Sequence, residues 1–137
     1  YMKPVYDVLE KNRGKVIYFD FWARWCPPCL AEMEPLKQLR SKFSTDDLII
    51  YSICVSEPKE QWEECLNEYS LRNRGIESVH VTDYLGIDNY QKIRKQWKID
   101  RMPYYVLINR KGQIIDFGTA ARPSNPQLVS RIEEAVK

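Results

Sequence analysis

The sequence contains one histidine, five glycines and no long apolar run. Its longest nearly apolar stretches, residues 16–22 and 48–55, are far shorter than the roughly 18 residues that a transmembrane helix needs, so we expect no membrane span in this chain. The low glycine content excludes collagen-like and low-complexity chains. Basic residues number 21 and acidic residues 19, and this balance argues against a nucleic-acid-binding protein that relies on bulk charge.

What the sequence does contain is typical of one globular domain. Its 137 residues are 44% apolar, 29% charged and 12% aromatic, and a chain of this length buries about two thirds of its unfolded surface. The first residue is Tyr1, and the opening residues do not show the charged segment and apolar core of a secretory signal. We therefore expect residues 1–137 to form a single, monomeric domain that is a fragment of a longer precursor.

Two strands and a helix are predicted in the first half. Residues 16–22 and 48–55 are apolar, aromatic and β-branched almost throughout, which is typical of strands buried on both faces of a parallel sheet. Pro27 and Pro28 suit the first turn of a helix between these strands, and Pro35 is expected to kink that helix. The apolar residues of one helix face recur at Cys29, Met33, Leu36 and Phe43.

The second half carries further helices, a strand and a hairpin. Two apolar segments, 104–109 and 113–117, flank a turn that ends in Gly112, which predicts a β-hairpin. Asn125 is placed to cap the last helix. Strands that alternate with helices and end in a hairpin predict an α/β fold with a central mixed sheet, parallel except at one side and flanked by helices. The remaining elements are predicted as helices at 58–72, 89–97 and 126–136 and a strand at 78–82.

Cys26 and Cys29 form a Cys-Pro-Pro-Cys motif at the predicted start of the first helix. Two cysteines at this spacing lie close enough for a disulfide. The N–H groups and the dipole at the helix start favour the thiolate of Cys26, and such cysteines have pKa values of roughly 3.5–7.5 rather than about 8.5. We therefore predict thiol–disulfide exchange, in which Cys26 attacks a disulfide and Cys29 resolves the mixed disulfide.

Other roles for a Cys-x-x-Cys pair fit less well. Haem attachment requires histidine after the second cysteine, where Leu30 stands, and a zinc site requires two further ligands. Cys54 and Cys65 form no second pair and His80 is the only histidine, so we expect no metal. Two alternatives stay open. One is a thiol peroxidase, although the Thr and Pro typical before its cysteine are absent, and the other is a binding module whose cysteines only stabilise the fold.

Residues 19–29, Phe-Asp-Phe-Trp-Ala-Arg-Trp-Cys-Pro-Pro-Cys, resemble the active-site strand and loop of the thioredoxin superfamily. Residues 101–105, Arg-Met-Pro-Tyr-Tyr, are similar to the cis-proline loop of that superfamily. Residues 76–97 resemble the inserted strand–helix unit of its TlpA/ResA branch. The resemblance covers about residues 15–137 and implies a thioredoxin-like fold. Members of this branch are extracytoplasmic thiol-disulfide oxidoreductases, so the resemblance also implies a periplasmic or membrane-tethered location.

The resemblance implies roles for two acidic residues. Asp20 matches a buried aspartate implicated in proton transfer involving the second cysteine, and burial should raise its pKa. Glu32, three residues after Cys29 on the same helix face, matches a glutamate of the TlpA/ResA branch. We hypothesise that the two carboxyl groups together manage the proton of Cys29. The alternatives are an Asp20 bonded to local backbone and a Glu32 that is a solvated surface charge.

A substrate-contacting surface is also implied. A cis Met102–Pro103 bond would place the Met102 backbone beside the first cysteine, where a substrate segment can pair with it like an added strand. Trp25 is expected to shield the thiols and to offer an apolar docking surface, unless it is an ordinary core tryptophan. Pro27 and Pro28 belong to the same surface and stiffen the loop between the cysteines.

The expected partners are protein disulfides and an upstream dithiol that supplies electrons, with no metal or organic cofactor. Cys54 and Cys65 are interpreted as buried free cysteines, with a second disulfide between them left open. Five basic residues approach the proline loop, and we favour a solvated helix face over a surface that steers an acidic partner. They are Lys92, Arg94, Lys95, Lys98 and Arg101.

Overall fold

The computed structural model describes residues 8–56, 58–84 and 86–137 and shows a five-stranded sheet in the order β3-β2-β1-β4-β5. β1 pairs with β2 and β2 with β3 in parallel, whereas β4 runs antiparallel to both β1 and β5. The predicted mixed sheet, parallel except at one side, is therefore confirmed. The strands are β1 (Val16–Trp22), β2 (Leu48–Cys54), β3 (Glu77–His80), β4 (Tyr104–Ile108) and β5 (Ile114–Gly118).

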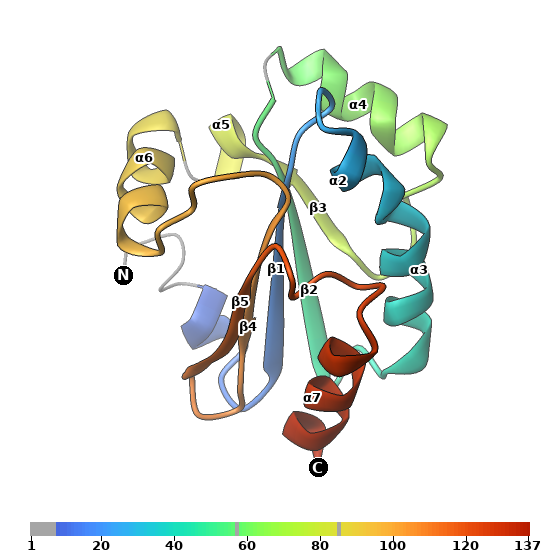
Figure 1. Cartoon of the computed structure of the whole chain (residues 1–137), viewed down its shortest axis with the longest axis vertical. Helices are drawn as coiled ribbons and strands as arrows, with labels where there is room; N and C mark the ends of the chain where they lie inside the picture. Colours follow the sequence, from blue (N-terminus) through green and yellow to red (C-terminus); the bar gives the residue numbers. More distant parts are fainter. Residues whose placement is uncertain (1–7, 57, 85) are drawn as a thin grey trace.

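Helices cover both faces of the sheet. α3 (Met33–Lys42) and α7 (Pro126–Val136) pack on one face and α6 (Ile87–Gln96) on the other, to the right and left of the sheet in Figure 1. Three shorter or outlying helices lie toward the end where β1, β2 and β3 finish (Figure 1). These layers, with an inserted unit from β3 to α6, agree with the fold that the resemblance implies. The three helices are α2 (Pro27–Ala31), α4 (Lys59–Glu68) and α5 (Val81–Tyr84).

β1 is the central strand, and all seven of its residues are buried. Successive side chains of a strand point to opposite faces of the sheet. Tyr18 therefore packs with α3 and α7, whereas Phe19 and Phe21 face α6. There the ring of Phe19 lies 5.7 Å from the ring of Trp97, measured between centroids. The same alternation directs Asp20 toward the face that α3 and α7 cover.

The helix after the cysteine motif is divided rather than merely kinked. α2 ends at Ala31 and α3 begins at Met33, with Glu32 between them. Pro35 has no N–H to donate to the carbonyl of Ala31, and its ring crowds that carbonyl, so the break falls about one turn before the proline. The predicted distortion is present in a stronger form, and it places Glu32 at a corner of the chain.

Two predicted elements differ in extent. α4 ends before the predicted boundary at residue 72 because Ser70 adopts a left-handed φ of 54°. The N–H of Leu71 then bonds to the carbonyl of Leu66 at 3.0 Å, which closes the helix with a Schellman turn. The strand predicted at 78–82 is shorter, and α5, which was not predicted, follows it directly. The other elements lie within two residues of their predicted bounds.

The cap of α7 can be tested by substitution. The side-chain oxygen of Asn125 accepts the N–H of Gln127 at 3.0 Å. Asn125→Ala removes this bond and should lower the free energy of unfolding, measured by urea denaturation, by about 1 kcal/mol. Ser130→Ala, at an exposed interior position of the same helix, is the control and should cause no loss, since alanine is the better helix former. An Asn125→Ala variant as stable as the parent would contradict the predicted contribution of the cap.

Candidate active site

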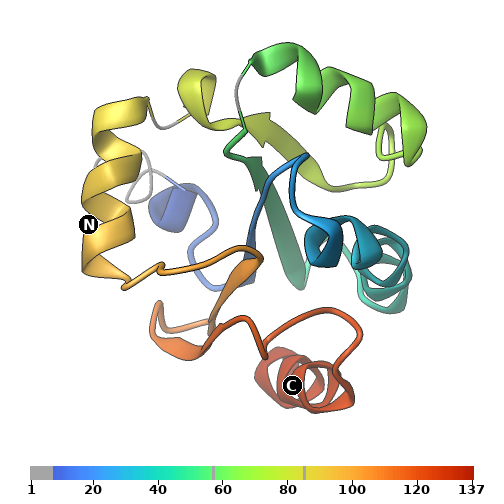
Figure 2. The same cartoon turned by 45° about the horizontal axis from the view of Figure 1, so that its top comes forward.

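The two cysteines of the motif lie beyond the carboxyl end of β1, where the chain turns into α2 (Figure 2). They form a disulfide, with Cα atoms 5.3 Å apart. Cys26 is also the N-cap of α2, and its Sγ accepts a hydrogen bond from the N–H of Cys29 at 3.2 Å. The helix start predicted from the two prolines is confirmed. When the pair is reduced, the same N–H stabilises negative charge on Cys26 Sγ.

The disulfide is covered, whereas the residues around it are exposed. Cys26 is 4% exposed and Cys29 1%, while Trp25 is 65% exposed. Trp25 is therefore not a core tryptophan, and the large exposed ring beside the disulfide fits the predicted docking surface. Pro27 and Pro28 are exposed as well.

The Met102–Pro103 peptide bond is cis, as the resemblance implies. Pro103 is buried, and Met102 is half-buried and packs against the cluster of buried residues that contains both cysteines. Thr119, just beyond β5, donates its hydroxyl hydrogen to the carbonyl of Pro103 at 2.8 Å. The proline loop therefore lies at the same edge of the sheet as the disulfide and is held there by the end of β5.

Asp20 lies buried on β1 with a partner on the neighbouring strand. The hydroxyl of Ser52 on β2 donates to Asp20 Oδ2 at 3.1 Å, so the bond is to a side chain and not to local backbone. Burial raises the pKa of Asp20 to about 7, against the smaller lowering effect of the Ser52 hydrogen bond. The negative charge of Glu32 raises it further. Asp20 can therefore bind or release a proton near neutral pH, as the sequence analysis predicts from its burial.

Glu32 is half-buried at the corner between α2 and α3 and is tied to the loop before α7. Its Oε1 accepts the N–H of Ser124 at 2.9 Å and its Oε2 accepts the Ser124 hydroxyl at 2.7 Å. Glu32 is thus a positioned carboxylate rather than a freely solvated one. Its negative charge also raises the pKa of Asp20, so the two predicted acidic residues interact electrostatically.

Three residues of this site were not predicted: Ser52, Ser124 and Thr119. Ser52 left a signal in the sequence, because it is a polar residue in an apolar strand, as Asp20 is in its own, and the parallel register pairs the two. Ser124 and Thr119 left none that we recognise. Each is an ordinary loop residue in the sequence, and its partner comes from a distant part of the chain.

Cys54 and Cys65 are both buried free thiols in the same apolar cluster as the disulfide. Burial raises the pKa of both thiols, which disfavours the reactive thiolate. Cys54 Sγ lies 3.1 Å from the hydroxyl of Ser56, whose oxygen also accepts the N–H of Arg24 in the active-site turn. The interpretation as buried free cysteines is confirmed.

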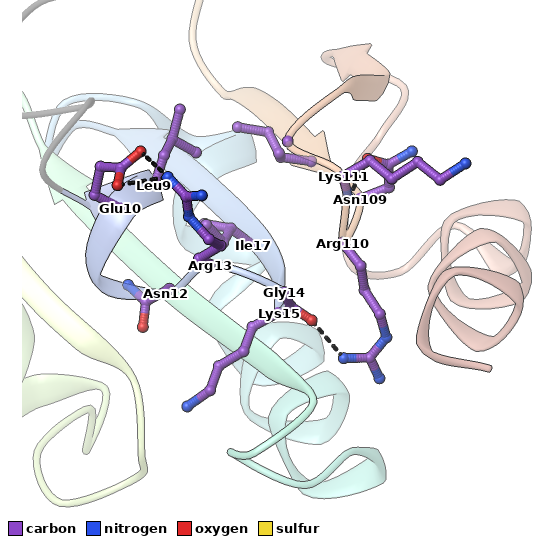
Figure 3. Close-up of a pocket in the computed structure, with 12 residues that line it drawn as sticks. Leu9, Glu10, Asn12, Arg13, Gly14, Lys15, Ile17, Asn109, Arg110 and Lys111 are labelled. Atoms are coloured by element: carbon purple, nitrogen blue, oxygen red, sulfur yellow. Dashed lines mark hydrogen bonds and ion pairs between the residues drawn. The ribbon is translucent and has the colours of Figure 1, made fainter.

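A hollow of about 440 Å³ lies at the end of the sheet away from the disulfide, between residues 9–17 and the β4–β5 turn (Figure 3). Arg110 reaches from this turn to the carbonyl of Gly14 at 2.8 Å, and it also bonds to Asp47 and to the carbonyl of Val136. These bonds fasten the hairpin to its neighbours, which is a structural role.

The part of the chain that the structure describes holds neither a cluster of metal-binding side chains nor a helix able to cross a membrane. Within residues 8–56, 58–84 and 86–137, no group of three or more His, Cys, Asp or Glu side chains is placed to hold a metal ion. The helices in this same part of the chain are too short or too polar to cross a bilayer.

Comparison with known proteins agrees with this geometry. Residues 5–136 match the Redoxin family. Among curated relatives, the thiol-disulfide oxidoreductase ResA of Geobacillus kaustophilus is 26% identical over 77% of this chain and 55% of its own length. ResA of Halalkalibacterium halodurans is 25% identical over 94% of this chain and 66% of its own length. The chain thus spans little more than half to two thirds of the length of these relatives.

Solved structures show the same fold. The thioredoxin domain of a thiol-disulfide oxidoreductase from Bacteroides vulgatus superposes with a TM-score of 0.77 at 22% identity and covers 94% of this chain and 84% of that chain. A solution structure from the same organism, assigned as a thiol-disulfide oxidoreductase, has a TM-score of 0.71 at 32% identity and covers 92% of this chain and 76% of that chain. The predicted thioredoxin-like, TlpA/ResA-like character is therefore confirmed.

The raised pKa of Asp20 predicts how stability depends on pH. Between the ordinary pKa of 3.8 and about 7, the unfolded chain has released this proton while the folded protein retains it. The stability of the parent therefore falls as pH rises through this window, by roughly 4 kcal/mol at most. Asp20→Asn cannot ionise and escapes the loss, so it should be more stable than the parent at pH 8 but not at pH 4.

Urea unfolding of the oxidised protein at pH 4, 6 and 8 measures this difference. Asp46→Asn, an exposed carboxyl, removes the same charge and should follow the parent at each pH. An Asp20→Asn variant whose advantage over the parent does not grow with pH would show that Asp20 is ionised in the folded state throughout.

Proposed function

The chain belongs to the Redoxin family, and on this premise we propose that it is a thiol-disulfide oxidoreductase that acts on protein disulfides through Cys26 and Cys29. The observation that carries this proposal is the disulfide itself, which joins two cysteines at the start of α2 on the sheet edge that also holds the cis Met102–Pro103 bond. A pair that only stabilised the fold would need neither the exposed Trp25 beside it nor an ionisable Asp20 behind it.

The proposed reaction is a two-step exchange that conserves electrons. In the reduced protein the thiolate of Cys26 attacks one sulfur of a substrate disulfide, a mixed disulfide forms, and the other substrate sulfur leaves as a thiolate. The thiolate of Cys29 then attacks Cys26 Sγ and releases the second substrate thiol. The protein ends with the Cys26–Cys29 disulfide and the substrate with two thiols. An upstream dithiol returns two electrons and completes the cycle.

Asp20 is proposed to take the proton that Cys29 must lose before the second step. It lies buried on β1, and its pKa of about 7 suits proton exchange at neutral pH. Glu32, held by Ser124, tunes this group, because its charge makes ionisation of Asp20 less favourable. Electrons pass only between sulfur atoms in this scheme, so it requires neither a metal nor an organic cofactor.

The direction and the setting of the reaction are also proposed. We infer a reductant that works outside the cytoplasm as a monomer. The resemblance of the sequence motifs to the extracytoplasmic TlpA/ResA branch supports this location, and the relatives named thiol-disulfide oxidoreductase ResA support the branch. Its partners are then the disulfides of other proteins and an electron-donating dithiol. Among the described residues, no specific contact favours the thiol peroxidase or the binding-module alternative.

The exchange mechanism predicts opposite behaviour for the two cysteines. Cys26→Ser should abolish reduction of a protein disulfide such as that of insulin, because the attacking sulfur is lost. Cys29→Ser should instead accumulate the mixed disulfide through Cys26, which mass spectrometry detects.

Titration of the parent protein against a thiol buffer gives the reduction potential of the Cys26–Cys29 pair. For a reductant we expect a value near that of thioredoxin, about −270 mV. If the cysteine pair showed no reversible two-electron titration, the proposed oxidoreductase activity would be refuted.

The proton-transfer role predicts a kinetic effect of the two amide variants. Asp20→Asn and Glu32→Gln should each slow resolution of the mixed disulfide, roughly tenfold or more for Asp20. Stopped-flow single-turnover rates between pH 5 and 9 measure this step. The parent rate should rise with pH through about 7, where Asp20 ionises, and Asp20→Asn should lose that rise. Unchanged rates in both variants across the range would refute the role.

A further inference from the structure

A groove of about 540 Å³ opens between the active-site turn and the inserted helices. On one side it is lined by Trp25 and by Met102, which packs against the cluster that contains both cysteines. On the other side it is lined by α6 and by the turn that follows α6, where Arg94, Arg101 and one acidic residue, Asp100, contribute charged groups with a net positive charge. The groove therefore joins an apolar surface next to the disulfide to a basic rim.

Charge differs sharply between the two sides of the active-site turn. Residues 87–101, which form α6 and the turn after it, contain five basic and two acidic residues. α4 contains four acidic residues and one basic residue. In Figures 1 and 2, α6 lies to the left of the turn from β1 into α2, whereas α4 runs next to this turn, mostly above it and to its right. A carboxylate near the disulfide is thus attracted toward α6 and repelled from α4.

Arg94 is fixed at the groove by the way α6 ends. Lys98 adopts a left-handed φ of 54°, and the N–H of Ile99 returns to the carbonyl of Arg94 at 2.9 Å. In return, Arg94 Nε donates to the carbonyl of Ile99 at 3.2 Å. This reciprocal pair holds the arginine stem across the turn that leads to Met102. Because Nε makes the bond, the two terminal nitrogens have no hydrogen-bond partner among the described residues, and a guanidinium binds a carboxylate through two N–H groups.

Arg101 is the second cation of the rim, and it is held only loosely. Its Nε lies 3.6 Å from Asp100 Oδ1, and both side chains are about 70% exposed, at 71% and 69%. An exposed pair of this kind contributes little to stability. A carboxylate brought by a partner can therefore replace Asp100 at small cost.

We propose that the groove binds the cysteine-bearing segment of an acidic partner protein: an apolar side chain enters beside Trp25 and Met102, and an aspartate or glutamate of the same segment binds Arg94 and Arg101. This inference rests on the proposed function, since it names the partner class of the same site. For Arg94 and Arg101 it takes the place of the interpretation as a solvated helix face, because these two of the five basic residues line the groove. Arg94 and Arg101 are then specificity-determining residues, while the sulfur chemistry stays with the cysteines.

Equilibrium binding tests this without any exchange chemistry. Two fluorescently labelled peptides carry serine in place of the reactive cysteine and one leucine beside it, and they differ only in two flanking glutamates or two flanking glutamines. Titrated with the oxidised protein, the glutamate peptide should bind roughly fivefold to tenfold more tightly at low ionic strength, and less so at about 0.5 M salt, where screening is strong. Equal binding of the two peptides, or binding of neither, would overturn the proposal.

Two double variants that remove the same charge test whether Arg94 and Arg101 cause the preference for the glutamate peptide. Arg94→Gln combined with Arg101→Gln should remove the preference for the glutamate peptide. Lys42→Gln combined with Lys111→Gln removes the same charge at exposed positions that do not line the groove, and it should keep the preference. Loss of preference in both pairs would mean a bulk charge effect and would also overturn the proposal.

The redox titration of the parent protein tests the proposed function independently of the peptide-binding experiment. A reversible titration without a peptide preference refutes the groove alone. A peptide preference without a reversible titration refutes the oxidoreductase and leaves an acidic-peptide-binding module.

Discussion

Burial of β1 on both faces is the constraint from which the rest of the site follows. The strand lies between β2 and β4, and helices cover both of its faces, so every side chain along it is removed from water. A carboxyl group in such a strand is costly to ionise, which is why the pKa of Asp20 rises to about 7 although Ser52 donates a hydrogen bond to it. The residues that follow the strand emerge at its carboxyl end, so the same strand delivers Cys26 to the sheet edge and keeps Asp20 in the core behind it.

That edge also receives segments from distant parts of the sequence, because of the directions of the strands. β4 runs antiparallel to β1, so the chain enters β4 where β1 ends, and the cis Met102–Pro103 bond falls beside the disulfide cluster. β5 reverses direction again and finishes at the same edge, where Thr119 reaches the carbonyl of Pro103. A sheet with only parallel strands would have needed a long crossover to bring a second loop to this place.

The parts of the structure that short-range chemistry determines could be predicted from the sequence, and the parts that depend on tertiary contacts could not. A continuous apolar run defines β1, the two prolines define the start of α2, and Asn125 defines the start of α7. The left-handed Ser70 and Lys98 gave no such signal, because glycine is the residue that usually marks this helix ending. The contact of Glu32 with Ser124 joins segments 92 residues apart, and nothing in either segment indicates the other. The exposure of Trp25 was equally open, since a tryptophan is buried or exposed according to what packs over it.

The two acidic residues act in the proposed mechanism through the number of buried charges. When Cys29 is a thiol and Asp20 is ionised, the two residues together carry one negative charge. When Cys29 is a thiolate and Asp20 is protonated, they again carry one. Transfer of the proton from sulfur to carboxylate therefore adds no charge to the buried region, whereas its release to water would add one there. The nearby charge of Glu32 strengthens this preference, because it makes a further buried negative charge still less favourable. The burial that raises the pKa of Asp20 is thus the same physical effect that would keep the proton within the site while the sulfur atoms exchange.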